Sequence, residues 1–102
     1  MIELTFLIPV ASNEAVTFTP KHHAQFEAVL IDHFDGFTRL PGEVVGGWSD
    51  GETVFHDTTI AYVVAIVSIV DGTKVATVVA FAKVHYAQKA IYVRYLGLSE
   101  VL

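Results

Sequence analysis

The fold is decided by residues 60–70, which read Ile-Ala-Tyr-Val-Val-Ala-Ile-Val-Ser-Ile-Val. This run is rich in β-branched side chains, which favour strands, and Ser68 is its one small polar member. A helix needs about 20 apolar residues to cross a bilayer, so the run is too short for a membrane span. It predicts a long buried strand from about Thr59 to Val70.

Upstream, the sequence predicts a strand followed by a helix. Residues 2–10 alternate apolar and polar side chains and close near a proline, as strands do. Thr19 followed by Pro20 is a helix-start signal, because the hydroxyl caps the first turn and proline suits the first helical position. Apolar residues at spacings of three and four carry this helix to about Phe34, and Asp35-Gly36 ends it.

The segment between this helix and the long strand is irregular. Pro41-Gly42 and Gly46-Gly47 interrupt an otherwise extended stretch from Phe37 to Trp48. We therefore expect a bulged or edge strand here. Turn residues at Ser49–Glu52 then make this strand the antiparallel neighbour of the long strand.

Downstream, Asp71-Gly72 permits two interpretations, since this pair is typical of hairpins but Asp71 could equally cap a helix. The apolar residues that follow, from Val75 to about Tyr86, mostly fit helical spacing, which favours the helix. Residues 90–98 alternate again and predict a last strand.

The expected order is strand, helix, strand, strand, helix, strand. With right-handed crossovers, this order gives an α+β, ferredoxin-like βαββαβ fold, in which two helices cover one face of a four-stranded antiparallel sheet. The length of 102 residues fits a single domain spanning residues 1–102.

Composition narrows the classes of partner. The net charge is −5, and six Lys and Arg residues are spread along the chain, so no cationic stripe exists for nucleic acid. Cysteine is absent, which excludes disulfides and thiolate metal sites. The N-terminus carries no signal-peptide pattern, so we expect a cytoplasmic protein with no membrane partner.

The long strand also predicts self-association. Its two faces, Ile60 with Tyr62 and Val64 on one side and Ala61 with Val63 on the other, are both apolar. A lone ferredoxin-like domain exposes one sheet face to water, where polar residues belong. We therefore expect a homo-oligomer that buries the sheet face including Ile60–Val70, with dimer and trimer both open.

The candidate site is the glycine-rich segment before the long strand. Trp48 could serve as a ligand platform, and His56 with Asp57 falls at a strand end, where ligands are often held. His22 and His23 lie about 100° apart on a helix, so they cannot chelate together, and we expect them to be solvated. No metal site or cofactor is predicted.

Three short pieces carry a resemblance: Phe34–Thr38, Gly47–Gly51 and Tyr86–Ile91. Together they resemble small bacterial domains of unknown function with a ferredoxin-like fold. The layout is also similar to P-II-type and CutA-type trimers, which implies a ligand near the loop of residues 41–57, between subunits. In outline it is similar to the dimeric α/β-barrel monooxygenase group.

These observations favour an oligomeric small-ligand-binding or regulatory module that uses Trp48, His56 and Asp57. Two alternatives remain. One is a small cofactor-independent enzyme of the dimeric α/β-barrel type, with a histidine such as His33 or His56 as general base. The other is a purely structural accessory subunit.

Overall fold

The structure is a computed structural model that describes residues 2–67 and 71–96. Within these residues it is a mixed α+β fold compatible with a ferredoxin-like plait, as the sequence predicted. The elements are β1 (Ile2–Pro9), α1 (Pro20–Phe34), β2 (Thr38–Arg39), β3 (Val44–Ser49), β4 (Val54–Ile66), α2 (Gly72–His85) and β5 (Tyr92–Leu96).

The antiparallel sheet is organised around β4. Its order is β2-β4-β1-β5, and β3 pairs with the first part of β4. The sheet has five strands where four were expected, because the segment before β4 is divided. Gly42, whose φ is +76°, lies between β2 and β3, and the two short strands pair with different parts of β4.

The bounds of the long strand differ from the prediction. β4 begins at Val54 rather than near Thr59, because β3 pairs with it from Val44 opposite Thr59 to Ser49 opposite Val54. It ends at Ile66, and the expected continuation through residues 68–70 lies outside the described residues. The prediction of a last strand is confirmed by β5. Residues 97 and 98, which the prediction included, lie outside the described residues.

The first helix, α1, begins and ends as its sequence signals indicate. The Thr19 hydroxyl accepts the His22 backbone N–H at 3.1 Å, and Pro20 is the first helical residue. Asp35 adopts a left-handed conformation, with φ of 66°, and its N–H closes on the Ile31 carbonyl. The ambiguous Asp71-Gly72 pair starts α2 and not a hairpin.

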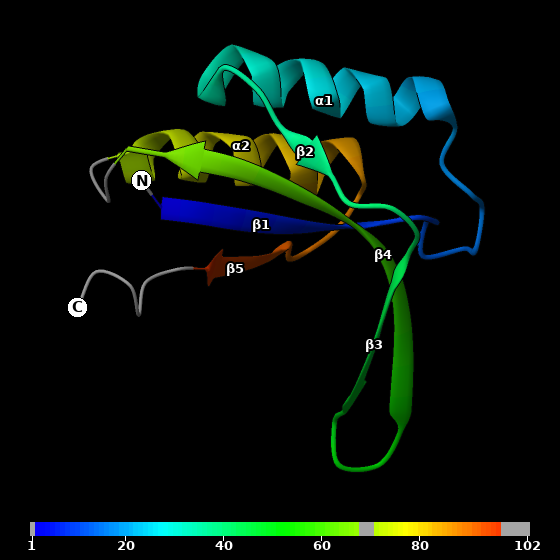
Figure 1. Ribbon diagram of the computed structural model, residues 1–102. Coiled ribbons are helices and arrows are strands. Elements are labelled where there is room, and N and C mark those ends of the chain that lie inside the picture. The colour runs from blue at the N-terminus through cyan, green and yellow to red at the C-terminus, as the bar shows by residue number, and fades with distance from the viewer. Residues whose placement is uncertain (1, 68–70, 97–102) are drawn as a thin grey trace.

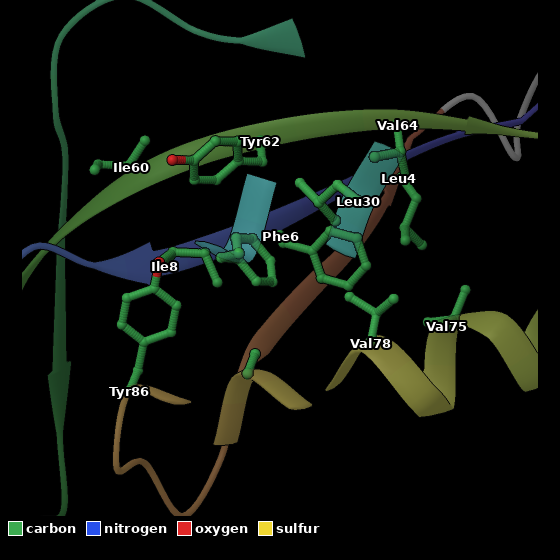
Figure 2. Close-up of a cluster of buried hydrophobic side chains, with 12 residues drawn as sticks. Leu4, Phe6, Ile8, Leu30, Ile60, Tyr62, Val64, Val75, Val78 and Tyr86 are labelled. Atoms are coloured by element: carbon green, nitrogen blue, oxygen red, sulfur yellow. The ribbon is translucent and has the colours of Figure 1, made fainter. Parts of the chain in front are cut away.

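Both helices pack on one face of the sheet (Figure 1). Alternate residues of β1 and β4 point into this layer, where they meet the apolar stripes of α1 and α2 (Figure 2). The core comprises Leu4, Phe6, Ile8, Phe26, Leu30, Ile60, Tyr62, Val64, Val75, Val78, Ala82 and Tyr86.

One part of the sheet extends beyond this core. β3 and the first half of β4 project as a hairpin away from both helices (Figure 1). We call residues 44–59 the arm. Its side chains are largely exposed, and its apolar ones are Val44, Val45, Trp48, Val54 and Phe55.

Neighbouring residues of α1 provide a test of the packing. Leu30 is fully buried, whereas Ile31 is 52% exposed. We expect Leu30→Ala to lower the free energy of unfolding by about 2–5 kcal/mol, because it leaves a cavity in the core. Ile31→Ala, the matched control, should change it by less than about 0.5 kcal/mol. Urea unfolding followed by circular dichroism measures both, and equal losses would contradict this core.

Candidate functional site

The register of the arm sorts its side chains into two faces. Residues directly opposite each other on an antiparallel pair share a face. Trp48 lies opposite Phe55 and Gly46 lies opposite Asp57, on the helix-free side of the sheet. Gly47 lies opposite His56 on the other face. The structure therefore brings Trp48 and Asp57 together and turns His56 away from them.

Trp48 is held in place although it is exposed. Its ring stacks on Phe55, with centroids 4.4 Å apart and planes 20° apart. Its Nε1–H donates to Asp57 Oδ2 at 2.9 Å. The side chain remains 53% exposed, so one aromatic face is both fixed and open to solvent.

A hollow of about 500 Å³ lies where the arm leaves the sheet. We call it the arm hollow. Its aromatic and charged groups come from Trp48 and Asp57 of the arm and from Tyr92 and Arg94 of β5. The backbone of Gly46 leaves open space, since an added Cβ would meet nothing within 4 Å. Aromatic, acidic and cationic groups thus surround one cavity.

A second hollow of about 670 Å³, the loop hollow, adjoins the first. The two share Leu7, Asp57, Thr59 and Tyr92. The loop hollow is completed by residues 10–13 and by Gln88, whose side-chain amide donates to Asn13 Oδ1 at 3.1 Å. His56 lines this hollow and not the arm hollow.

The arm tip is a tight acidic turn. Asp50 Oδ1 accepts the backbone N–H groups of Glu52 and Thr53 at 2.9 and 2.8 Å. These hydrogen bonds hold the pKa of Asp50 below its ordinary value. Asp50 therefore stays anionic in mildly acidic solution.

The other histidines lie outside both hollows. His33 Nδ1 donates to the Val29 carbonyl of its own helix at 3.0 Å. The expectation that His22 and His23 are solvated is wrong: His23 is only 5% exposed, and His22 is partly buried. Both pack against the end of α2, a contact between segments 63 residues apart that spacing along one helix does not reveal.

A buried polar group links α1, β4 and β2. The Tyr62 hydroxyl donates to Glu27 Oε2 at 2.7 Å, and Arg39 Nη1 lies 3.5 Å from the same oxygen. Burial, followed by this hydrogen bond, raises the pKa of Tyr62 well above its usual range. Burial likewise raises the pKa of Tyr86. Both phenols therefore stay neutral and act as hydrogen-bonding groups of the core.

Two residues that line the arm hollow were not found from the sequence. Tyr92 and Arg94 line the arm hollow, yet their only sequence signal was the alternation of residues 90–98, which predicts a strand but no site.

In the described part of the chain, no group of three or more His, Asp or Glu side chains could hold a metal ion. Neither described helix is long and apolar enough to cross a membrane.

Comparison with known proteins shows similarity at the level of the fold. No family model matches the chain, and no curated protein matches it. Among solved structures, a phage SAM lyase in complex with S-methyl-5'-thioadenosine superposes with a TM-score of 0.62 at 11% identity. The match covers 92% of this chain and 78% of the lyase chain.

Trp48 is the only tryptophan in the chain, so its fluorescence reports on the site. We expect Asp57→Ala to lower its fluorescence anisotropy, because the ring loses the hydrogen bond that fixes it. An exposed hydrogen bond contributes about 0.5–1.5 kcal/mol, so the fold should persist. Asp32→Ala removes an equal charge from an exposed position on α1, away from the arm, and should leave the anisotropy unchanged. Identical anisotropy in Asp57→Ala and wild type would contradict the fixed geometry.

Proposed function

We propose that the protein is an oligomeric binding module that holds a small ligand with a flat aromatic ring in the arm hollow. The observation that carries this proposal is the fixed but open ring of Trp48. Most exposed aromatic side chains move freely, whereas stacking on Phe55 and the hydrogen bond to Asp57 already orient this one. A preoriented ring loses less conformational entropy when a ligand stacks on it.

The lining of the arm hollow suggests the ligand class. Trp48 and Tyr92 offer aromatic surfaces for a base, and Asp57 can accept hydrogen bonds from ribose hydroxyls. Arg94 can pair with a carboxylate or another anion. An adenine nucleoside derivative satisfies these groups. The phage lyase of similar fold binds S-methyl-5'-thioadenosine, which makes this compound and its parent SAM reasonable probes.

Self-association is the second part of the proposal, and we place its main contact in the arm. Of the two strand faces expected from the sequence, the one with Val64 is covered by the helices, while Val67 is 82% exposed. The arm exposes five further large apolar side chains without a core of its own. An isolated two-stranded hairpin is marginally stable in water, so a second copy is the economical cover for it.

Charge favours a head-to-tail arrangement of the copies. The arm tip carries Asp50 and Glu52, while the exposed edge strand β5 carries Arg94 in a chain with few cations. An arm laid toward β5 of the next copy would bring these opposite charges near each other. Such an arrangement would also place the arm hollow at the boundary between subunits.

An enzymatic role is the alternative, favoured by the fold shared with a lyase. A histidine base would then act from the loop hollow, where His56 lies, because none of the described histidines lines the arm hollow. The His33 side chain is hydrogen-bonded to the Val29 carbonyl of its own helix.

Calorimetric titration with S-methyl-5'-thioadenosine tests the ligand. We expect binding to wild type and about tenfold weaker binding to Arg94→Gln when SAM, which has a carboxylate, is the titrant. A tenfold loss is about 1.4 kcal/mol, near the lower end of what one hydrogen bond to a charged group contributes. Lys74→Gln on α2 removes the same charge away from the hollow and should bind normally. Chromatography of SAM after incubation with the protein shows whether SAM is only bound or is converted to a product. If neither compound gives heat of binding, adenine nucleoside derivatives are excluded as ligands of the arm hollow.

Light scattering tests the assembly. We expect wild type to be a multimer at micromolar concentration, and Val45→Asp/Val54→Asp in the arm to be a folded monomer, since both side chains are exposed. Val84→Asp, an exposed position on α2, is the control and should remain a multimer. Val67→Asp tests the sheet end originally predicted, because Val67 is 82% exposed. A monomeric wild type would contradict self-association.

A further inference from the structure

The loop hollow is a cavity of ligand size beside the arm hollow. Its volume of about 670 Å³ lies within the range of small-molecule sites. Apolar side chains form much of its wall, among them Pro9, Val10 and Ile91. Val10 and Ile91 also pack against the core, so this part of the wall is preformed. Trp48 and Arg94 line the arm hollow but not the loop hollow.

Two side-chain amides meet at the wall of the loop hollow. The amide of Gln88 donates one N–H to Asn13 Oδ1 at 3.1 Å and the other to the Tyr86 carbonyl at 3.2 Å. Because a carbonyl oxygen can only accept, these contacts fix which end of the Gln88 amide is nitrogen. In the described part of the chain, Gln88 Oε1 and Asn13 Nδ2 are then left without a partner. We call Asn13 and Gln88 the amide pair.

Backbone hydrogen bonds hold both segments that carry the amide pair. Ser12 donates its N–H to the Val16 carbonyl at 2.8 Å, and its hydroxyl accepts the Val16 N–H at 3.1 Å. On the other segment, the Gln88 N–H donates to the Lys83 carbonyl of α2 at 2.8 Å. A ligand that bound the amide pair would therefore have little backbone motion to arrest, which favours binding.

Backbone strain occurs in the same two segments. Ala15, two residues after Asn13, has a φ of 62°, and Ala87, directly before Gln88, has a φ of 52°. This left-handed conformation is unfavourable for residues other than glycine. Strain of this kind gathers in segments that hold ligands, where the surrounding structure maintains it. Its presence on both sides of the amide pair is a second indication of a site.

Hydrogen-bonding capacity and charge define what the loop hollow can hold. Asn13 Nδ2 can donate and Gln88 Oε1 can accept, so the amide pair offers one group of each kind. Among the described residues that line the hollow, Asp57 is the only Asp, Glu, Lys or Arg. A carboxylate or phosphate would be repelled by Asp57 and would find no cation there. The lining therefore suits a neutral group that combines a donor with an acceptor.

We propose that the loop hollow is a second binding site, which takes a neutral planar ligand with an N–H₂ donor beside an acceptor. The acceptor of the ligand binds Asn13 Nδ2, its donor binds Gln88 Oε1, and its flat ring packs on the apolar wall. Primary carboxamides such as nicotinamide carry this combination, and so does the edge of adenine. The inference is independent of the proposed function, because it uses neither the ring of Trp48 nor Arg94.

Nuclear magnetic resonance tests the site on wild type. Asn13 is the only asparagine in the chain, so its side-chain amide gives a distinct signal. We expect nicotinamide to shift the side-chain signals of Asn13 and Gln88 and to leave the Trp48 indole N–H unchanged. Nicotinic acid, which has the same ring but a carboxylate, should bind at least about tenfold more weakly, because it lacks the donor and is repelled. Equal affinity for the two compounds overturns the site.

Adenine is the second probe, with hypoxanthine as its control, because hypoxanthine has an oxygen in place of the N–H₂ group. A shift of the amide-pair signals with adenine but not with nicotinamide supports the site and assigns it to the base. A shift of the Trp48 signal alone, with either probe, places binding in the arm hollow and overturns the site. So does the absence of any shift of the amide pair with both probes.

A matched pair of variants tests the role of Asn13. Asn13→Asp keeps an oxygen to accept the Gln88 N–H but loses the Nδ2 donor. Gln25→Glu adds the same charge at an exposed position on α1, away from the hollow. We expect Asn13→Asp to bind nicotinamide, or adenine if that is the ligand, about tenfold more weakly than wild type. Gln25→Glu should bind as wild type does. Wild-type affinity in Asn13→Asp overturns the assignment.

Discussion

Backbone pairing along β4 is the constraint on which the rest of the structure depends. This strand contacts β1, β2 and β3, so it fixes the positions of nearly all other strands. Its thirteen residues extend farther than the two helices can cover. From Ile60 onward, alternate residues therefore enter the core, whereas the first six residues belong to the arm. A single long strand thus gives the molecule both a dry helix-covered layer and an exposed apolar projection.

The fold could be predicted because its signals are local. Thr19, Pro20 and Asp35 bound α1 through interactions within a few residues, and strand alternation follows from the backbone itself. The division into β2 and β3 could not be predicted in the same way. Gly46-Gly47 weakens a strand by propensity, but pairing with β4 overrides that weakness. The structure of such segments is decided by a strand partner that lies elsewhere in the sequence.

The site was predictable only in part, for a similar reason. Trp48 and Asp57 were singled out for their types, and the hairpin register brings them together. The same register turns His56 away, because successive side chains of a strand point to opposite faces. Arg94 and the histidine contacts between helix ends depend on segments far apart in the chain. No spacing rule within one element could reveal them.

Polar groups inside the helix-covered layer explain how an apolar sequence keeps one arrangement. Leucine and valine side chains alone tolerate several packings of two helices on a sheet. Tyr62 must reach Glu27, and Tyr86 must reach His23, since a buried polar group without a partner is costly. These pairs fix the rotation and height of α1 relative to β4 and α2.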